Sequence, residues 1–287
     1  MIRSTRTIGR GLSILVGLLA LSTNLPAAGV FKVCADPNNP PYSSRDEKGF
    51  ENKIARLLAD QLDQKIEYTW FPQRMGFIRN TLKAKIEDSD DYKCDVITGV
   101  PERADMVTTT SAYYRSTYMM VFRRTGELEK VQSPEDVIAL PDSVKSRLKI
   151  ATYDHQPGTD WILKNGLIGQ GIPYQSMTGD VSQNPAQVLV QDFTNKKIDL
   201  AIVWGPIASY VVRTVGSDLS MIPMKSDKAI RFDYPIAMGV RVPDQARKKL
   251  LDELIKKEQK EIISILDGFG VPLVNEQGNL LTGQSQK

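Results

Sequence analysis

The chain has 287 residues, of which 41% are hydrophobic and 25% charged, with 20 glycines and 16 prolines. These are ordinary globular values, and they exclude disordered, collagen-like and coiled-coil chains. The length suits one large or two medium domains. The formal net charge is only +3, so the placement of the charges along the chain is more informative than their sum.

The N-terminus has the pattern of a secretory signal peptide. Arg3, Arg6 and Arg10 precede an apolar run at residues 11–22, and small residues near position 28 offer a cleavage site. The run is shorter than the roughly 20 residues that span a bilayer, which argues against the alternative of an uncleaved anchor. We therefore expect residues 1–28 to be removed on export, leaving a mature chain without a membrane span.

Export changes the expected charge and the expected partners. Loss of the three N-terminal arginines leaves 34 basic and 34 acidic side chains, so the mature chain is formally neutral. Without a basic excess, counterion release supplies little affinity for a polyanion. Nucleic acid is therefore excluded as a partner.

Export also exposes the two cysteines, Cys34 and Cys94, to an oxidising compartment in which a disulfide can form. Both lie beside predicted strands that should be neighbours, which favours a bridge; two buried thiols are the alternative. The single histidine, His155, has no cysteine or histidine beside it in the sequence. No metal site is therefore expected.

In chain order, strand patterns alternate with helix patterns, which is typical of an α/β fold with a largely parallel sheet. We expect strands at residues 30–35, 66–71, 95–100, 113–124, 148–153, 200–204 and 234–241. We expect helices at residues 50–62 and 77–86, after Ser133 and Pro157, at residues 184–193, and at residues 244–267. Ligands of such sheets bind beyond the carboxyl ends of the strands, so the turns after the strands are the candidate binding region.

Several of these turns resemble those of one fold family. The order of a first strand, a Pro40-Pro41-Tyr42 turn, Gly49-Phe50-Glu51 and Tyr113-Tyr114 resembles a type II periplasmic solute-binding protein. The resemblance implies two α/β lobes, the second inserted in the first, that close over a ligand by hinge motion. Lobe I would comprise residues 29–121 plus 232–287, and lobe II residues 122–231.

A narrower resemblance rests on five blocks: VCADPNN from Val33, YTWFPQR from Tyr68, FIRNTL from Phe77, YYRSTY from Tyr113 and VWGP from Val203. In this order and spacing they resemble the MoxJ/XoxJ family. The resemblance implies a periplasmic accessory protein, without a cofactor of its own. Its partner would be a methanol or alcohol dehydrogenase that depends on pyrroloquinoline quinone, alone or with its cytochrome c.

The charged residues of the turns indicate which kind of ligand the cleft can bind. Amino-acid receptors of this fold hold the α-carboxylate with an arginine and the ammonium with an aspartate. Arg103 follows the third strand in a shorter turn than usual, and the aspartate position, five residues after Asp199, holds Trp204. Because an unpaired buried charge is costly, an α-amino acid is disfavoured, whereas a neutral, aromatic or anionic ligand is not.

Other residues are candidates on local grounds. Thr159 lies in a turn that opens a helix and could present backbone N–H groups to an anion, although Asp160 beside it makes a plain helix cap an equal alternative. Tyr114 and Arg115 fall where lobe I meets the cleft, and aromatic and arginine side chains anchor protein interfaces. The predicted ligand- or partner-binding residues are Asp36, Asn38, Asn39, Tyr42, Arg74, Arg103, Tyr114, Arg115, Thr159 and Trp204.

The sequence does not indicate an enzyme. His155 stands outside any Ser/His/Asp spacing, and the chain has no nucleophile elbow or phosphate-binding glycine loop. The acids Glu47 and Glu51 are explained by capping of a helix dipole. We expect an accessory protein that binds the dehydrogenase or a segment of it. The alternative is the binding component of an ABC transporter for a small non-amino-acid organic ligand, with an ABC permease as partner.

Overall fold

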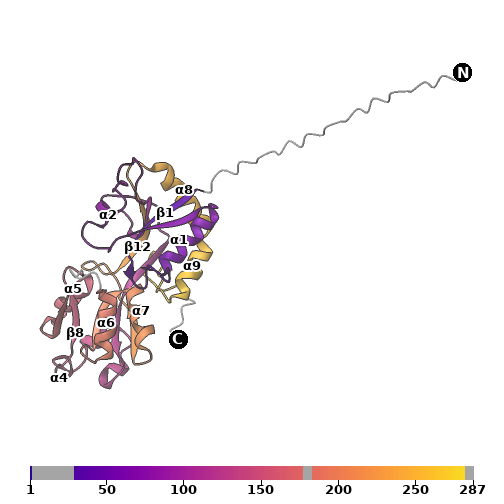
Figure 1. Cartoon of the computed structure of the whole chain (residues 1–287). Helices are drawn as coiled ribbons and strands as arrows, with labels where there is room; N and C mark the ends of the chain where they lie inside the picture. Colours follow the sequence, from indigo (N-terminus) through magenta and orange to yellow (C-terminus); the bar gives the residue numbers. More distant parts are fainter. Residues whose placement is uncertain (2–28, 177–182, 282–287) are drawn as a thin grey trace.

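The computed structural model describes Met1 and residues 29–176 and 183–281 (Figure 1). The predicted signal peptide therefore lies outside the described residues, apart from Met1. Two α/β lobes are joined by one sheet, whose strand order is β4-β1-β5-β12-β7-β10-β8-β9, with β6 paired to β12 and β11 paired to β7. The predicted two-lobed α/β fold is confirmed.

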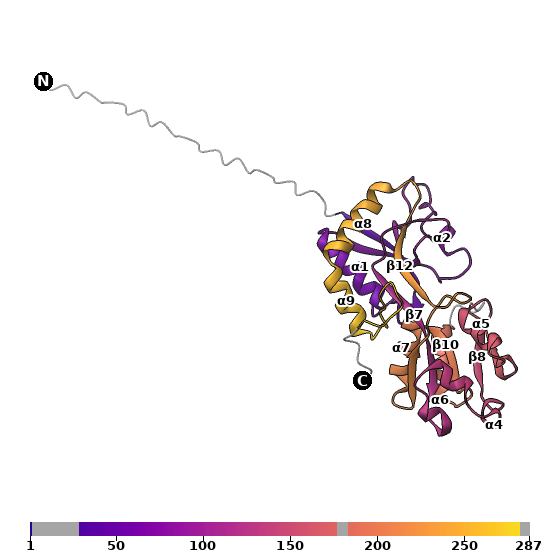
Figure 2. The same cartoon turned by 180° about the vertical axis from the view of Figure 1, so that it is seen from behind.

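The first lobe is a mostly parallel sheet covered by helices. β1 runs parallel to β4 with Val30 opposite Lys65, and it also pairs in parallel with β5. Figure 2 shows α1, α8 and α9 together on one side of this sheet. The elements are β1 (Val30–Ala35), β2 (Asn38–Asn39), β3 (Ser43–Ser44), α1 (Phe50–Gln61), β4 (Lys65–Trp70), α2 (Phe77–Asn80), β5 (Val96–Pro101), β6 (Thr108–Thr109), β12 (Asp233–Val240), α8 (Gln245–Lys257) and α9 (Gln259–Gly268).

The second lobe is entered and left through the central strands. β7 (Tyr114–Arg123) pairs with β12 over its first residues, then with β10 and β11 on either side from residue 118 or 119 onwards. The remaining elements are the 3-10 turns Gly126–Lys130 and Ile168–Gln170, α3 (Pro134–Ile138), α4 (Asp142–Lys145), β8 (Ile150–Tyr153), α5 (Pro157–Lys164), β9 (Gly171–Tyr174), α6 (Pro185–Thr194), β10 (Leu200–Trp204), α7 (Gly205–Val215) and β11 (Leu219–Pro223). The limits of the lobes at residues 121 and 232 stay a prediction.

The helix that supports the cleft forms for reasons visible in the sequence. In α1 the side chains of Phe50, Ile54 and Leu58 recur at helical spacing and are fully buried. The side-chain oxygen of Asn52 accepts the backbone N–H of Gly49 at 3.3 Å and thereby caps the first turn. The apolar stripe predicted for residues 50–62 therefore becomes part of the first-lobe core.

Two predicted helices are wrong in extent. The helix expected at residues 77–86 is only α2, because the backbone leaves the helical region at Thr81 (φ −121°, ψ −86°), whose hydroxyl donates to the Phe77 carbonyl. The helix expected at residues 244–267 is two helices, because Glu258 departs from helical geometry (φ −97°, ψ 14°) between α8 and α9. Both α8 and α9 contribute buried apolar residues to the first-lobe core.

Several elements were not predicted from the sequence, among them the short β2, β3, β6, β9 and α4 as well as α7 and β11. α7 begins directly at Gly205, where the sequence suggested only the end of a strand, and β11 follows it. No helix in the described part of the chain is long and apolar enough to cross a membrane.

The predicted disulfide is confirmed. Cys34 at the end of β1 and Cys94 before β5 are bonded, with their Cα atoms 5.4 Å apart, and both side chains are buried. The bond ties the end of β1 to the segment that leads into β5. It closes a loop across 60 positions of the sequence.

Replacing both cysteines by serine should lower the free energy of unfolding by about 4 kcal/mol, because the unfolded chain regains the entropy of the closed loop. Urea unfolding of the oxidised wild type and of the double variant measures this difference. Reductant should destabilise the wild type and leave the variant unchanged. A loss below about 1 kcal/mol would contradict this expectation.

Candidate functional site

Two adjoining cavities, with volumes of about 400 and 320 Å³, lie between the lobes. We call them the outer cavity and the inner cavity, respectively. The residues that line both are Asn39, Tyr42, Gln73, Tyr118 and Trp204. The outer cavity is also lined by residues of α6 and by Gln156. The inner cavity is also lined by Glu51 and Tyr114 of the first lobe.

The turn after β1 forms one wall through backbone hydrogen bonds. The carboxylate of Asp36 accepts the backbone N–H groups of Asn38 at 2.8 Å and Gln73 at 2.5 Å, which joins this turn to the turn after β4. The carbonyl of Tyr42 accepts the N–H of Glu51 at 2.9 Å. A Cβ atom on Gly49 would lie 2.0 Å from the Tyr42 carbonyl oxygen, so only glycine allows this close approach.

Asn184 links this turn to the second lobe. Its side-chain oxygen accepts the N–H of Ala186 at 2.8 Å and caps α6. Its amide nitrogen donates to the Asn38 carbonyl at 3.2 Å and to the side-chain oxygen of Asn39 at 3.0 Å. Asn184 is 5% exposed. The sequence indicated the cap but not the link across the cleft.

Three aromatic rings form the wall shared with the hinge strands. Trp204 is directly opposite Tyr118 in the β10–β7 pair, and Tyr234 lies on β12, on the other side of β7. The ring centroids are 5.5 Å apart for Tyr118 and Trp204, 6.0 Å for Trp204 and Tyr234, and 6.4 Å for Tyr118 and Tyr234. The rings meet at angles of 64–66°, the edge-to-face arrangement that aromatic pairs prefer.

Glu51 places a carboxyl group in the inner cavity. It is only 6% exposed, and its Oε2 accepts the hydroxyl of Thr98 at 2.7 Å. A Cβ atom on Gly99 would lie 1.9 Å from its Oε1, so this oxygen lies directly against the glycine. Burial, and secondarily the negative charge of Asp36, raise the pKa of Glu51 from 4.5 to about 7, although the Thr98 hydrogen bond opposes this shift.

Tyr114 is a second buried polar group in the inner cavity. Its side chain is 5% exposed, and within the described part of the chain its hydroxyl has no hydrogen bond of normal geometry, although the indole of Trp204 is close enough to act as a donor and to lower the pKa. Burial and the neighbouring Tyr113 and Glu51 nevertheless raise the pKa of Tyr114 well above its usual value. Buried hydroxyls normally have a hydrogen-bond partner, so this one is a candidate for contact with a ligand.

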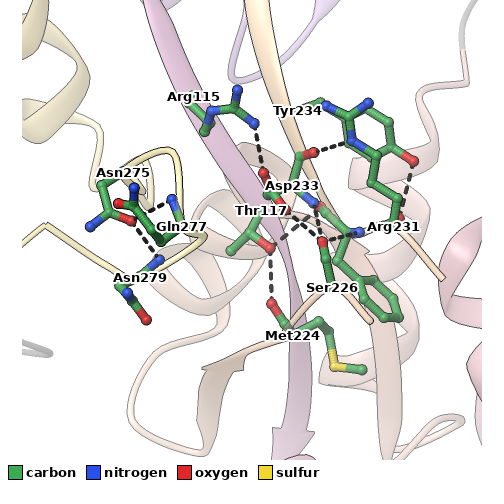
Figure 3. Close-up of polar contacts among 11 residues, drawn as sticks. Arg115, Thr117, Met224, Ser226, Arg231, Asp233, Tyr234, Asn275, Gln277 and Asn279 are labelled. Carbon is green, nitrogen blue, oxygen red and sulfur yellow. Dashed lines mark hydrogen bonds and ion pairs between the residues drawn. The ribbon is translucent and has the colours of Figure 1, made fainter. Parts of the chain in front are cut away.

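Two of the three predicted arginines lie outside these cavities. Arg103 and Arg115 line a third cavity of about 220 Å³ together with Arg231, outside the inner and outer cavities. Arg115 forms an ion pair with Asp233 at 2.6 Å, and the second oxygen of Asp233 accepts the hydroxyl of Ser226 (Figure 3). Arg74, by contrast, lines the outer cavity.

Thr159 stands apart from all three cavities. Its hydroxyl accepts the N–H of Tyr153 at 2.9 Å and donates to the Tyr153 carbonyl at 2.8 Å, so it holds the turn between β8 and α5. The outer cavity brings together six of the ten predicted residues: Asp36, Asn38, Asn39, Tyr42, Arg74 and Trp204. Tyr114 joins the inner cavity.

Sequence reasoning missed several residues of these cavities. Tyr118 follows Tyr114 at the four-residue spacing that places two side chains on one face of a strand, so strand periodicity could have identified it. Glu51 was attributed to dipole capping, and no sequence signal distinguishes a buried acid from an exposed one at a helix start. Glu51 changes the expectation that was based on Trp204 at the aspartate position. The first lobe supplies a carboxyl group to the inner cavity, although neither Arg103 nor Arg115 lines that cavity.

The fold and the cleft define a two-lobed binding protein of the type II periplasmic class. No protein-family model matches the chain. The crystal structure of periplasmic binding protein XoxJ from Methylobacterium extorquens is 30% identical and superposes with a TM-score of 0.67 over 86% of this chain and 100% of that one. The chain belongs to the MoxJ/XoxJ family.

Two further proteins are similar to the chain, one in sequence and one in fold. Protein MoxJ of Methylorubrum extorquens is 27% identical over 266 residues, which cover 87% of this chain and 83% of the relative. The crystal structure of MxaJ from Methlophaga aminisulfidivorans has the same fold, with a TM-score of 0.68 at 23% identity over 85% of this chain and 100% of that one.

Glu51→Gln should remove a pH dependence of stability. The folded protein holds the Glu51 proton more tightly than the unfolded chain, so the wild-type free energy of unfolding should fall as pH rises from 4.5 to about 7. The glutamine side chain can still accept the Thr98 hydroxyl but cannot ionise. The variant should therefore equal the wild type near pH 4.5 and exceed it by up to about 3 kcal/mol near pH 8.

Urea unfolding at both pH values measures this difference. Glu47→Gln is the matched control, because Glu47 is a partly exposed acid paired with Arg56. A Glu51→Gln variant with the same pH profile as the wild type would show that the buried carboxyl does not titrate in this range.

Asn184→Asp should loosen the contact between the lobes. Aspartate can still cap α6, but it loses both donor bonds to the turn after β1 and brings its charge towards the Asn38 carbonyl. Small-angle X-ray scattering should show a larger radius of gyration, with little change in thermal stability. Asn165→Asp is the control, because the Asn165 amide donates to Trp161 within the second lobe. Identical scattering of Asn184→Asp and wild type would refute the link.

Proposed function

We propose that this protein is a periplasmic accessory protein for a methanol or alcohol dehydrogenase that depends on pyrroloquinoline quinone. It supports activity or maturation of the enzyme by binding the dehydrogenase, alone or with its cytochrome c, or a segment of it, in the cleft. The observation that carries this proposal is the aromatic wall of Tyr118, Trp204 and Tyr234 beside an inner cavity that, in the described part of the chain, no arginine lines. The similarity to MoxJ and XoxJ supports it.

The charges in the cleft agree with this choice. A receptor for free amino acids needs an arginine and an acid on opposite sides of one ligand. Here the carboxyl group of Glu51 faces the inner cavity, while Arg115 is paired with Asp233 outside it. Arg74 lines the outer cavity, but it comes from the first lobe, as does the acid Asp36, so the two do not lie on opposite lobes. Aromatic side chains are the residues that contribute most to binding of polypeptide partners.

The protein is proposed to be a binding protein without catalytic activity. His155 lies at an exposed position in a left-handed turn and lines none of the three cavities. In the described part of the chain, no group of three histidine, cysteine or acidic side chains could hold a metal ion.

A second candidate is the binding component of an ABC transporter for a small organic ligand other than an amino acid. The volumes of the two cavities, about 400 and 320 Å³, favour it, because small-molecule sites usually fall in this range. The two candidates differ in whether the wall of the cleft contacts a polypeptide or a metabolite.

Capture of apo- and holo-dehydrogenase by the immobilised protein tests the proposal. Trp204→Leu should weaken capture at least about tenfold, as expected for an aromatic anchor of an interface. Trp70→Leu is the control, because Trp70 is stacked on Tyr68 and lines none of the three cavities. Thermal shifts with small metabolites, including pyrroloquinoline quinone, are measured in parallel. Large stabilisation by one metabolite without retention of the dehydrogenase would favour the transporter component.

A further inference from the structure

The inner cavity contains a buried acid without a cationic partner. Glu51 is 6% exposed, and its hydrogen bond within the described part of the chain comes from the neutral Thr98. None of the residues lining this cavity is a lysine, arginine or histidine. The charge that acts on Glu51 is that of Asp36, which is negative. A buried carboxylate in such surroundings is costly unless it takes up a proton or a cation.

A second polar group points to the same place. The hydroxyl of Tyr114 is buried and lines the inner cavity together with Glu51, and among the described residues it has no hydrogen bond of normal geometry, the indole of Trp204 being a nearby donor. The charge of Glu51 contributes to the raised pKa of Tyr114. The cavity therefore has two acceptor groups at one end, and a donor with several N–H bonds can satisfy both.

The remaining wall suits the apolar and cationic parts of such a donor. The rings of Tyr118, Trp204 and Tyr234 meet edge to face and all three line the inner cavity. The guanidinium of Arg231 lies over the Tyr234 ring, 4.8 Å from its centroid, which shows that this ring accepts a cation. Positive charge is attracted to the faces of tryptophan and tyrosine rings, and alkyl groups pack against them. An anion would instead be repelled by Glu51 and Asp36.

We propose that the inner cavity binds a primary alkylammonium group, with the ammonium at Glu51 and Tyr114 and the alkyl chain against Tyr118, Trp204 and Tyr234. A zwitterionic amino acid is disfavoured in the inner cavity, because none of the described residues that line it is an arginine that would take the carboxylate. The ammonium can belong to a lysine side chain of a bound polypeptide or to a free amine. This inference goes beyond the proposed function, since it concerns the chemistry of the ligand and not the identity of the partner.

Isothermal titration calorimetry with two charged probes and their neutral counterparts tests the proposal. The probes are n-butylammonium and N-acetyl-lysine methylamide; the counterparts are n-butanol and N-acetyl-norleucine methylamide. At about pH 8 at least one charged probe should bind about tenfold or more tighter than its counterpart. Tight binding of n-butylammonium alone identifies a free amine as the source, and tight binding of the lysine derivative alone identifies a polypeptide.

Two variants make the test specific to the carboxyl group. Glu51→Gln, which keeps an acceptor for Thr98, should weaken binding of the charged probe at least about tenfold, whereas Glu47→Gln should not change it. Lowering the pH to about 5.5 should weaken wild-type binding by about tenfold or more and leave the Glu51→Gln variant unaffected. The groups around Glu51 in this comparison are Asp36, Thr98, Tyr42, Tyr68, Tyr113 and Tyr114.

Equal affinities for charged and neutral probes, retained affinity in the Glu51→Gln variant, or no binding of either charged probe would overturn the proposal. Capture of the dehydrogenase by the same preparations is a separate readout. A wild type that captures the enzyme but binds no amine refutes the ammonium site alone. A wild type that binds amine but does not retain the enzyme refutes the accessory function alone.

Discussion

The antiparallel pairing of β7 with β12 holds the walls of the cleft in register. Asp233 lies opposite Thr117, and one residue further along β7 the N–H of Tyr118 donates to the Phe232 carbonyl at 3.0 Å. The hydroxyl of Thr117 is also bonded to the segment that returns from the second lobe, at the carbonyl of Met224. The rings of Tyr118 and Tyr234 therefore meet only while this pairing is intact, and both cavities depend on it.

The charges of the cleft are separated according to their partners. Arg115 and Asp233 neutralise each other on the hinge strands, whereas Glu51 is left facing aromatic rings. Ion pairs that are largely removed from water hold elements in place but offer little to a ligand. The inner cavity therefore presents a carboxyl group and the aromatic wall beside it, and this is where we propose that the ammonium group binds.

Local patterns predicted most of the fold. The strand at residues 30–35, the helix that begins at Phe50 and the disulfide depend on side-chain periodicity, turn residues and compartment, all of which can be read from the sequence. α7 was missed because its apolar residues follow a buried strand without an intervening polar turn.

The cleft was less predictable, because its key features depend on tertiary contacts. The turn after β1 drew attention to Asp36, Asn39 and Tyr42, which do line the outer cavity. The burial of Glu51 depends on Gly99, which lies far along the sequence on β5, and the second role of Asn184 depends on the docking of the lobes. Neither contact can be predicted from the pattern of neighbouring residues in the sequence. The roles of the ten residues predicted from the sequence stay predictions.

The position of Trp204 gives the cleft its own optical probe. The two other tryptophans have different surroundings: Trp161 is buried in the core of the second lobe, and Trp70 is stacked on Tyr68 with ring centroids 4.5 Å apart. Trp204 alone of the three borders both cavities between the lobes. The emission of its indole depends on local polarity and on nearby quenchers, so intrinsic fluorescence reports occupancy of the cleft without an attached dye.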